Sequence, residues 1–269
     1  MMKKIDSKVL SFVVFTLIIS LLSGCSNKIK AEKKESFIRV FAAASLTECF
    51  EEIGKELEKK NNLKVEFNFA GSQQLAINIE QGALAEVYAS ANMKYMEELE
   101  KKQAIDSSVV FAKNKLIICK NKNSNANIRK LSDLGGVGVK LVVADKSVPV
   151  GDYFYSAVDK AVKSGELTTS DKEKILANIK SNELNVKDVV SKVLIGQVDA
   201  GVVYKTDINL NNKDKLEIVE PEEFSGNEVS YPIAVLKNSE NKENAQVFVD
   251  FVNSKEGKAI LKKYGFVVE

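Results

Sequence analysis

The chain has 269 residues, of which 45% are hydrophobic and 28% are charged, and its 39 Lys and Arg residues nearly balance its 37 Asp and Glu residues. This length and composition allow a large apolar core in about two domain-sized units, and the balanced charge offers no basic surface for nucleic acid. The sequence contains no histidine, which excludes Ser-His and Cys-His nucleophiles and histidine metal ligands, and with them the commonest hydrolase and zinc chemistries.

Residues 1–24 have the pattern of an export signal. Three lysines precede an apolar run from Val9 to Leu22, which is short for a membrane span of about 20 residues. The run ends in Leu22-Ser23-Gly24-Cys25, which resembles the bacterial lipobox and implies cleavage before Cys25 and lipidation of its thiol. A chance cysteine after an ordinary signal peptide is the alternative. Residues 25–36 are polar and aperiodic, so we expect a tether there and a fold that starts near Phe37.

Strand and helix patterns alternate from Phe37 onward, which predicts an α/β fold with largely parallel sheets. Short apolar runs predict strands, and apolar residues at helical spacing predict helices. The predicted strands are 37–42, 64–70, 86–90, 115–119, 141–144, 200–204 and 231–236. The predicted helices are 46–57, 73–81, 92–102, 152–164, 170–178, 186–195 and at least two between 242 and 264.

Two serines stand where a predicted strand passes into a helix. In FAAASLTECF (41–50), Ser45 and Glu48 match a capping box, with Ser45 as N-cap and Glu48 as third helical residue. In FAGSQQLA (69–76), Ser72 opens the next helix. Helix starts attract anions, and the carboxyl ends of neighbouring parallel strands share one edge of a sheet. A serine that only caps its helix is the plainer interpretation of either junction alone, but the pair favours an anion site.

Seven short motifs follow one another along the chain: FAAASL, FAGSQQLA, ASAN, VPVG, GVVY, YPIAV and KKYGF. In order and spacing they resemble the molybdate-binding proteins of bacterial molybdate ABC importers, over about Phe37 to Val268. The resemblance implies a two-lobed periplasmic-binding-protein-like fold of type II. Each lobe would be a mostly parallel sheet flanked by helices, and two segments near 111–116 and 230–235 would cross between them. Lobe 1 would comprise residues 37–115 and 232–269, and lobe 2 residues 116–231.

The resemblance also implies a ligand and its contacts. Members of the family hold a tetrahedral oxyanion between the lobes through hydroxyl groups and backbone amides. By position, Ser45 and Ser72 would donate hydrogen bonds from lobe 1. Val150 and Val186 would donate through their backbone N–H groups, and Tyr204 through its phenol, from lobe 2. The expected ligand is molybdate or tungstate, bound as an oxyanion without protein–metal bonds, and no cofactor is expected.

A site of donors alone favours a fully deprotonated dianion. A protonated phosphate carries a hydroxyl that would lack an acceptor there, at a cost of about 1 to 3 kcal/mol. Sulfate meets the same condition as molybdate, so a receptor of the same fold for sulfate or another small anion is the alternative. A third hypothesis is an anion-using enzyme or a sensor domain, although the sequence shows no catalytic constellation.

These interpretations predict a binding protein rather than an enzyme, placed outside the cytoplasm and anchored to the cell membrane through a lipid on Cys25. The expected partners are the permease and ATPase of a molybdate ABC transporter, with no nucleic acid, and the protein is expected to be a monomer. Cys49 and Cys119 fall within a helical and a strand pattern and are expected to be buried thiols, with one disulfide between them left open.

Overall fold

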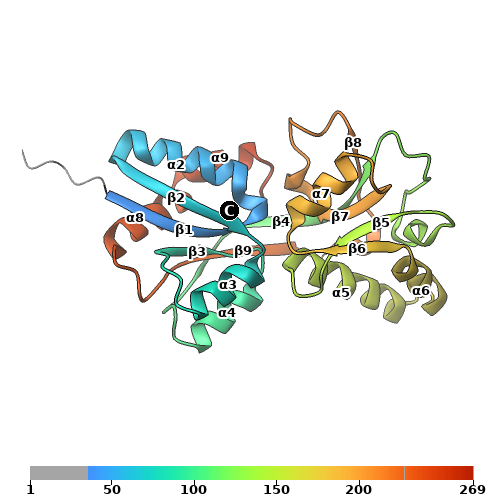
Figure 1. The fold of residues 1–269 in the computed structure, drawn as a ribbon, viewed down its shortest axis with the longest axis horizontal. Coiled ribbons are helices and arrows are strands. Elements are labelled where there is room, and N and C mark those ends of the chain that lie inside the picture. The colour runs from blue at the N-terminus through green and yellow to red at the C-terminus, as the bar shows by residue number, and fades with distance from the viewer. Residues whose placement is uncertain (1–35, 227, 269) are drawn as a thin grey trace, which may run out of the picture. The chain divides into compact units, whose positions relative to one another are not determined.

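The computed structural model describes residues 36–226 and 228–268, which lie within one compact unit (Figure 1). The expected signal peptide, Cys25 and most of the tether lie outside the described residues. The strands are β1 (Ser36–Ala43), β2 (Leu63–Ala70), β3 (Val87–Ala89), β4 (Val109–Asn121), β5 (Leu141–Ala144), β6 (Ile179–Glu183), β7 (Ala200–Tyr204), β8 (Leu216–Val219) and β9 (Glu228–Val235).

Helices follow most of the strands. The α-helices are α2 (Thr47–Asn61), α3 (Ser72–Glu80), α4 (Met93–Lys101), α5 (Pro149–Ser164), α6 (Thr169–Ala177), α7 (Val186–Leu194), α8 (Lys242–Asn253) and α9 (Lys255–Lys263). Short 3-10 turns are η1 (Ala44–Leu46), η2 (Leu131–Gly135), η3 (Lys205–Asp207) and η4 (Glu222–Phe224). None of the helices in the described ranges has the length and apolar content needed to cross a membrane.

The strands join in the order β2-β1-β3-β9-β4-β7-β5-β6, with β8 paired to β4. The pairs of β1 with β2 and β3, and of β5 with β6 and β7, are parallel, as predicted. The long strands β4 and β9 run antiparallel to their neighbours. β4 pairs with β9 through residues 109–115 and with β7 and β8 through residues 116–121, so one strand links the two groups of parallel strands.

Side chains on both faces of the second half of β1 are buried, as expected for a parallel strand covered by helices on each side. Ile38, Val40 and Ala42 pack in the same cluster as the apolar residues of α2 and α8. Phe41 points the other way, into a second cluster with residues of α3 and α4. Figure 1 shows α2 and α9 on one side of this group of strands and α3 and α4 on the other. This packing fixes the direction of β1 and β2, and with it the position of the residues that follow them.

The predicted strands and helices are present, with boundaries that differ by a few residues. β4 is longer than predicted, since it starts at Val109 rather than near 115. β6 and β8 were missed. β6 (IKSNE) has a single apolar residue and pairs only with β5, so its strand character comes from backbone pairing that leaves no hydrophobic pattern. The division of the chain into two lobes stays a prediction.

Cys49 and Cys119 are both buried free thiols, which confirms the preferred interpretation and leaves no disulfide between them. Burial raises the pKa of the Cys49 thiol, and it raises that of the Cys119 thiol to about 12. Both groups therefore stay protonated and behave as small apolar side chains. Within the described ranges, no group of three or more Cys, Asp or Glu side chains is arranged to hold a metal ion.

Candidate binding site

The five residues that the sequence singled out line one small cavity, which has about 210 Å³ of space when the part open to solvent is included. Its walls are formed by Ala43, Ala44, Ser45, Ala70, Gly71, Ser72, Ala91, Val148, Pro149, Val150, Asn185, Val186 and Tyr204. None of these wall residues carries a formal charge. A larger hollow of about 1280 Å³ lies elsewhere, along the loop that contains Asp133 and Val137, and it contains none of the five. The small cavity is therefore the candidate site.

Four helical segments begin at the cavity, each after a strand of a parallel pair. η1 follows β1, α3 follows β2, α5 follows β5 and α7 follows β6. The N-cap residues of α3 and α5, Gly71 and Val148, make no side-chain cap. The first N–H groups of a helix have no partner within the helix and carry its positive end. The cavity wall is thus rich in backbone N–H groups that have no partner within their own helix. Such donors suit an anion.

Ser45 does not cap a helix, so the capping-box prediction is wrong. A 3-10 turn, η1, separates β1 from α2, and the N-cap of α2 is Leu46 without a side-chain bond. The hydroxyl of Thr47 donates to the carbonyl of Ala44 at 2.7 Å and ties this turn together. The buried Ser45 hydroxyl instead lies 2.9 Å from the phenol oxygen of Tyr231 on β9. Tertiary contact has overridden the local capping signal.

Ser72 is the first residue of α3, as the sequence predicted, and the residue is 1% exposed. Its Oγ accepts a hydrogen bond from the backbone N–H of Ala91 at 3.0 Å. The phenol of Tyr88 donates to the Ser72 carbonyl at 2.9 Å. The serine is therefore held from two directions, and its hydroxyl proton is left for a group in the cavity.

Tyr204 ends β7 and is buried, and its phenol oxygen has no hydrogen-bond partner among the described residues. Its ring packs edge-on against Tyr231, with the ring centroids 5.8 Å apart. Burial raises the pKa of both phenols well above the usual value, so both keep their protons. An orphaned buried donor is costly, and a ligand that accepts its hydrogen bond would remove that cost.

Val150 and Val186 contribute backbone at two helix starts. Val150 lies in the first turn of α5 beside Gly151, where a Cβ would come within 2.1 Å of the Asp145 carbonyl oxygen, so only glycine lets α5 begin there. Val186 is the first residue of α7, after the N-cap Asn185, whose side chain accepts from the N–H of Asp188 at 3.1 Å. That cap leaves the Val186 amide free to face the cavity.

Contacts between distant segments close the cavity. The side-chain amide of Gln73 on α3 donates to the carbonyl of Leu184 at 2.9 Å. The phenol of Tyr95 on α4 donates to the carbonyl of Ser147, just before α5. A Cβ on Gly71 would lie 2.4 Å from the Leu184 carbonyl oxygen, so this approach requires a glycine. The two halves of the wall are in contact in this conformation.

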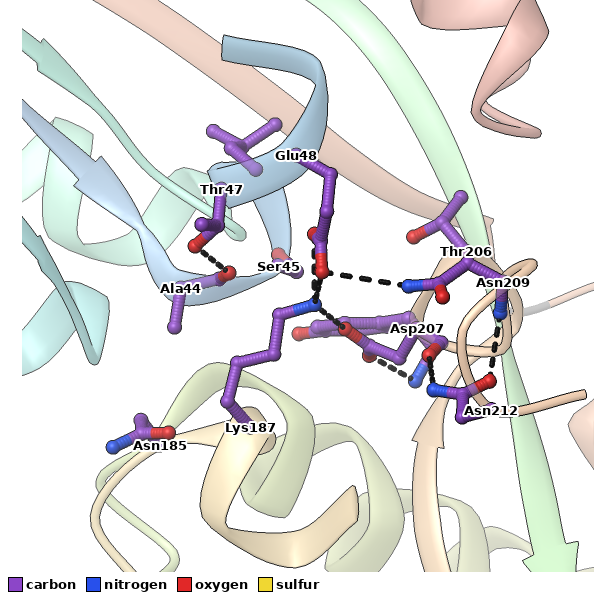
Figure 2. A network of polar contacts seen from close by, with 12 residues as sticks. Ala44, Ser45, Thr47, Glu48, Asn185, Lys187, Thr206, Asp207, Asn209 and Asn212 are labelled. Carbon is purple, nitrogen blue, oxygen red and sulfur yellow. Dashed lines mark hydrogen bonds and ion pairs between the residues drawn. The ribbon is translucent and has the colours of Figure 1, made fainter. Parts of the chain in front are cut away.

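A charged network next to the cavity adds another contact between these segments (Figure 2). The ammonium group of Lys187 on α7 binds both carboxylate oxygens of Glu48 on α2, at 2.7 and 2.8 Å, and lies 3.7 Å from Oδ1 of Asp207. Asp207 is fully buried, and its other carboxylate oxygen accepts the backbone N–H of Tyr204 at 3.0 Å. The network thus connects Glu48, one turn after Ser45, to Lys187, which directly follows Val186.

Burial and neighbouring charges act against each other on the pKa values of this network. Burial raises the pKa of Asp207 to about 6, although the Lys187 ammonium acts in the opposite direction. Burial alone would lower the pKa of Lys187, but the Asp207 and Glu48 carboxylates outweigh it and raise that pKa. Lys187 therefore stays charged over the whole physiological range.

Sequence patterns assigned no role to Lys187, Tyr231 or Asn114. Tyr231 lies within the YPIAV motif, which was a signal for the family but not for a contact with Ser45. Lys187 directly follows Val186, and Glu48 was interpreted as a helix cap. Each of these contacts joins residues more than 100 positions apart, which is beyond what local patterns can show.

The chain matches the family model for bacterial extracellular solute-binding proteins over residues 38–267. It is 37% identical over 231 residues to the molybdate-binding protein ModA of Mycobacterium bovis, which covers 85% of this chain and 84% of the relative. It is 28% identical over 263 residues to YvgL of Bacillus subtilis, a putative ABC transporter substrate-binding lipoprotein, with 96% and 97% of the two chains covered.

Two solved structures share the fold. One is the substrate-binding domain of a putative molybdenum ABC transporter from Clostridium difficile, with a TM-score of 0.62, 29% identity, and coverage of 87% of this chain and 99% of that one. The other is the periplasmic molybdate-binding protein of Azotobacter vinelandii, with a TM-score of 0.73, 20% identity, and coverage of 86% and 99%. The second supports the fold alone.

Proposed function

The chain belongs to the bacterial extracellular solute-binding proteins, and from that premise we propose that its small cavity binds molybdate or tungstate for delivery to an ABC importer. Membership makes it a substrate-binding component of a transporter rather than an enzyme. The molybdate-binding relatives support the choice of ion. The proposal takes the permease and ATPase of that importer as the partners.

The observation that carries the proposal is the convergence of uncharged donors on one cavity. Ser45, Ser72 and Tyr204 offer hydroxyls, and the starts of α5 and α7 offer the amides of Val150 and Val186. An anion that leaves water must exchange its whole hydration shell for oriented dipoles, and helix starts with hydroxyls supply them.

We further propose that two lobes close on the ion. Lobe 1 would comprise 37–115 and 232–269, and lobe 2 would comprise 116–231, with β4 and β9 as the connections. Ser45 and Ser72 then belong to lobe 1 and the other three residues to lobe 2. An ion bound by both would favour the closed form through its greater affinity for it, and a transporter could sense that form.

Calorimetric titration of the full chain, solubilised in a mild detergent, with molybdate, tungstate, sulfate and phosphate tests this function. The proposal predicts tight one-to-one binding of molybdate and tungstate. Preference for sulfate would instead favour a sulfate receptor of the same fold, because sulfate is also a tetrahedral dianion without donors. Binding of none of the four ions would refute an oxyanion receptor.

The membrane anchor is a separate part of the proposal. The sequence Leu22-Ser23-Gly24-Cys25 and the lipoprotein name of the Bacillus relative support a lipid on Cys25 outside the cytoplasm. Mass spectrometry of protein from bacterial membranes should find a diacylated N-terminal Cys25, and Cys25→Ala should prevent lipidation and cleavage at this site. Wild-type protein released without a lipid would contradict the anchor while leaving ion binding intact. A monomer is expected by size measurement.

A further inference from the structure

Behind Ser45 lies a chain of hydrogen bonds through Tyr231 and Asn114. We propose that Asn114 and Tyr231 are positioning residues that hold the Ser45 hydroxyl as a donor, and that they thereby select fully deprotonated oxyanions over protonated ones. The inference rests on the proposed function, because it concerns how the same cavity recognises its ion. A serine hydroxyl can donate or accept, so its neighbours decide which it does.

The orientation of the Asn114 amide is set by three contacts. Its Oδ1 accepts the backbone N–H of Lys115 at 2.9 Å. Its Nδ2 therefore faces the other way and donates to Thr206 Oγ1 at 2.8 Å and to the phenol oxygen of Tyr231 at 3.3 Å. Asn114 is 2% exposed, so water does not compete for these bonds. The phenol oxygen of Tyr231 is thus an acceptor toward Asn114.

This fixes the direction of the next bond. If Ser45 donated to Tyr231, the phenol oxygen would accept twice, and its own proton would lack an acceptor among the described residues. An unpaired buried donor is unfavourable by about 5-fold to 150-fold in the equilibrium. Tyr231 therefore donates to Ser45 Oγ across the 2.9 Å contact, and the Ser45 proton is left to point into the cavity that Ser45 lines.

The Ser72 hydroxyl is also held as a donor, but by a single contact. Its Oγ accepts the N–H of Ala91, and a backbone N–H can only donate, so this hydroxyl also presents its proton. The Tyr204 phenol has no partner among the described residues, but if it accepted from a ligand its own proton would stay unpaired. Both serines therefore favour an ion with acceptor oxygens only, and for Ser45 this preference depends on Asn114 and Tyr231.

Sulfate and hydrogen phosphate form a matched pair of probes. Both are tetrahedral dianions of similar size at about pH 8, and only hydrogen phosphate carries a hydroxyl that needs an acceptor. The measured quantity is the selectivity ratio, defined as the dissociation constant of hydrogen phosphate divided by that of sulfate. The rise in melting temperature with ion concentration gives both constants for the full chain, even where binding is weak.

Two variants alter the Ser45 contact in different ways. Tyr231→Phe keeps the ring but frees the Ser45 hydroxyl to turn and accept, so the selectivity ratio should fall about 5-fold or more. Asn114→Asp replaces the donor with an acceptor, so Tyr231 would donate to it and Ser45 would donate to Tyr231. The lone pair of Ser45 would then face the cavity, and the ratio should fall further. Repulsion by the new carboxylate acts on both dianions and cancels in the ratio.

Tyr264→Phe is the control, because it removes a phenol that donates to Glu52 at 2.8 Å, away from the residues that line the cavity. Its ratio should equal that of wild type. A ratio within about twofold of wild type in either folded variant of Tyr231 or Asn114, or a wild-type ratio near one, would overturn the inference. Failure of wild type to bind molybdate would instead refute the proposed function, whatever the ratio.

Discussion

The two sides of the cavity present different kinds of donor. Ser45 and Ser72, after β1 and β2, offer hydroxyls whose oxygens are engaged from behind by Tyr231 and by the N–H of Ala91. We call these two residues the serine side. Val150, Val186 and Tyr204, at α5, α7 and β7, form the amide side, on which the backbone N–H groups need no such partner and the Tyr204 phenol has none within the part of the chain that the structure describes.

The difference shows what each kind of donor needs from the fold. An amide only donates, so a helix start is sufficient to aim it. A hydroxyl is ambivalent, and a second layer of residues must fix its direction. The serine side should therefore be sensitive to changes behind it, whereas Val150 and Val186 should respond only to loss of the N–H group itself.

The largest effect is expected from the serine side. Ser72→Ala removes a donor to the anion and also leaves the buried N–H of Ala91 without its acceptor, and Ser45→Ala does the same to the Tyr231 phenol. Loss of the donor should lower molybdate affinity by up to about 150-fold in calorimetry, whereas the unpaired inner group is present with and without the ion and lowers stability instead. Ser164→Ala, at the end of α5, should bind as wild type. A loss of less than about threefold for either cavity serine would exclude it as a ligand.

A proline substitution tests the amide side. Asn185 is extended, with φ −156° and ψ 166°, which suits a residue before proline, and the first helical position accepts proline well. Val186→Pro should therefore keep the start of α7 but remove its N–H, and weaken molybdate binding about 10-fold to 150-fold. Val186→Ala, which keeps the N–H, isolates the loss of packing. Equal affinities of the two variants would show that this amide does not contact the ion.

A smaller effect is expected where the two sides are joined. Glu48→Gln weakens the ion pair between Glu48 and Lys187. Both side chains are partly exposed, Glu48 at 31% and Lys187 at 27%. Such pairs contribute about 1 kcal/mol or less, so molybdate should dissociate roughly 2-fold to 5-fold faster in stopped-flow measurements. Comparison with Lys187→Met and the double variant isolates the pair. Additive effects would mean that Glu48 and Lys187 do not act together.

The smallest effect on ion binding, and a clear one on stability, is expected at Asp207. Burial raises its folded pKa to about 6, above 3.8, so the folded protein holds a proton that the unfolded chain releases. Its contribution to stability is complete below about pH 4 and is lost as the pH rises through about 6, on the order of 3 kcal/mol in all. Asp207→Asn keeps an acceptor for the Tyr204 N–H and removes this titration.

The measurement is urea unfolding of both proteins at about pH 4 and pH 7. The free energy of unfolding of Asp207→Asn minus that of wild type should rise with pH. Carboxyls whose pKa is lowered in the fold, such as Asp145 and Glu183, make the free energy of unfolding rise with pH. Their contribution is the same in both proteins and cancels in this difference. A difference that does not change with pH would show that Asp207 titrates as an ordinary exposed aspartate.

Local patterns in the sequence predicted the alternating strands and helices and brought Ser45 and Ser72 to attention, because both follow apolar strands. Val150, Val186 and Tyr204 were predicted only from the family resemblance. For the two valines the reason is that a backbone amide leaves no side-chain signal. The capping box at Ser45 was locally sound, but the η1 turn and the contact with Tyr231, 186 positions away, replaced it. The second layer behind the serine side depends on such long-range contacts, which a single sequence does not reveal.

The most direct test of the account is a crystal structure of the protein grown with molybdate, in which anomalous scattering locates the molybdenum atom. The account predicts one ion in the cavity, with its oxygens within about 3.2 Å of the hydroxyls of Ser45, Ser72 and Tyr204 and of the amides of Val150 and Val186. An ion bound elsewhere, or one in the cavity that contacts neither serine hydroxyl, would contradict it.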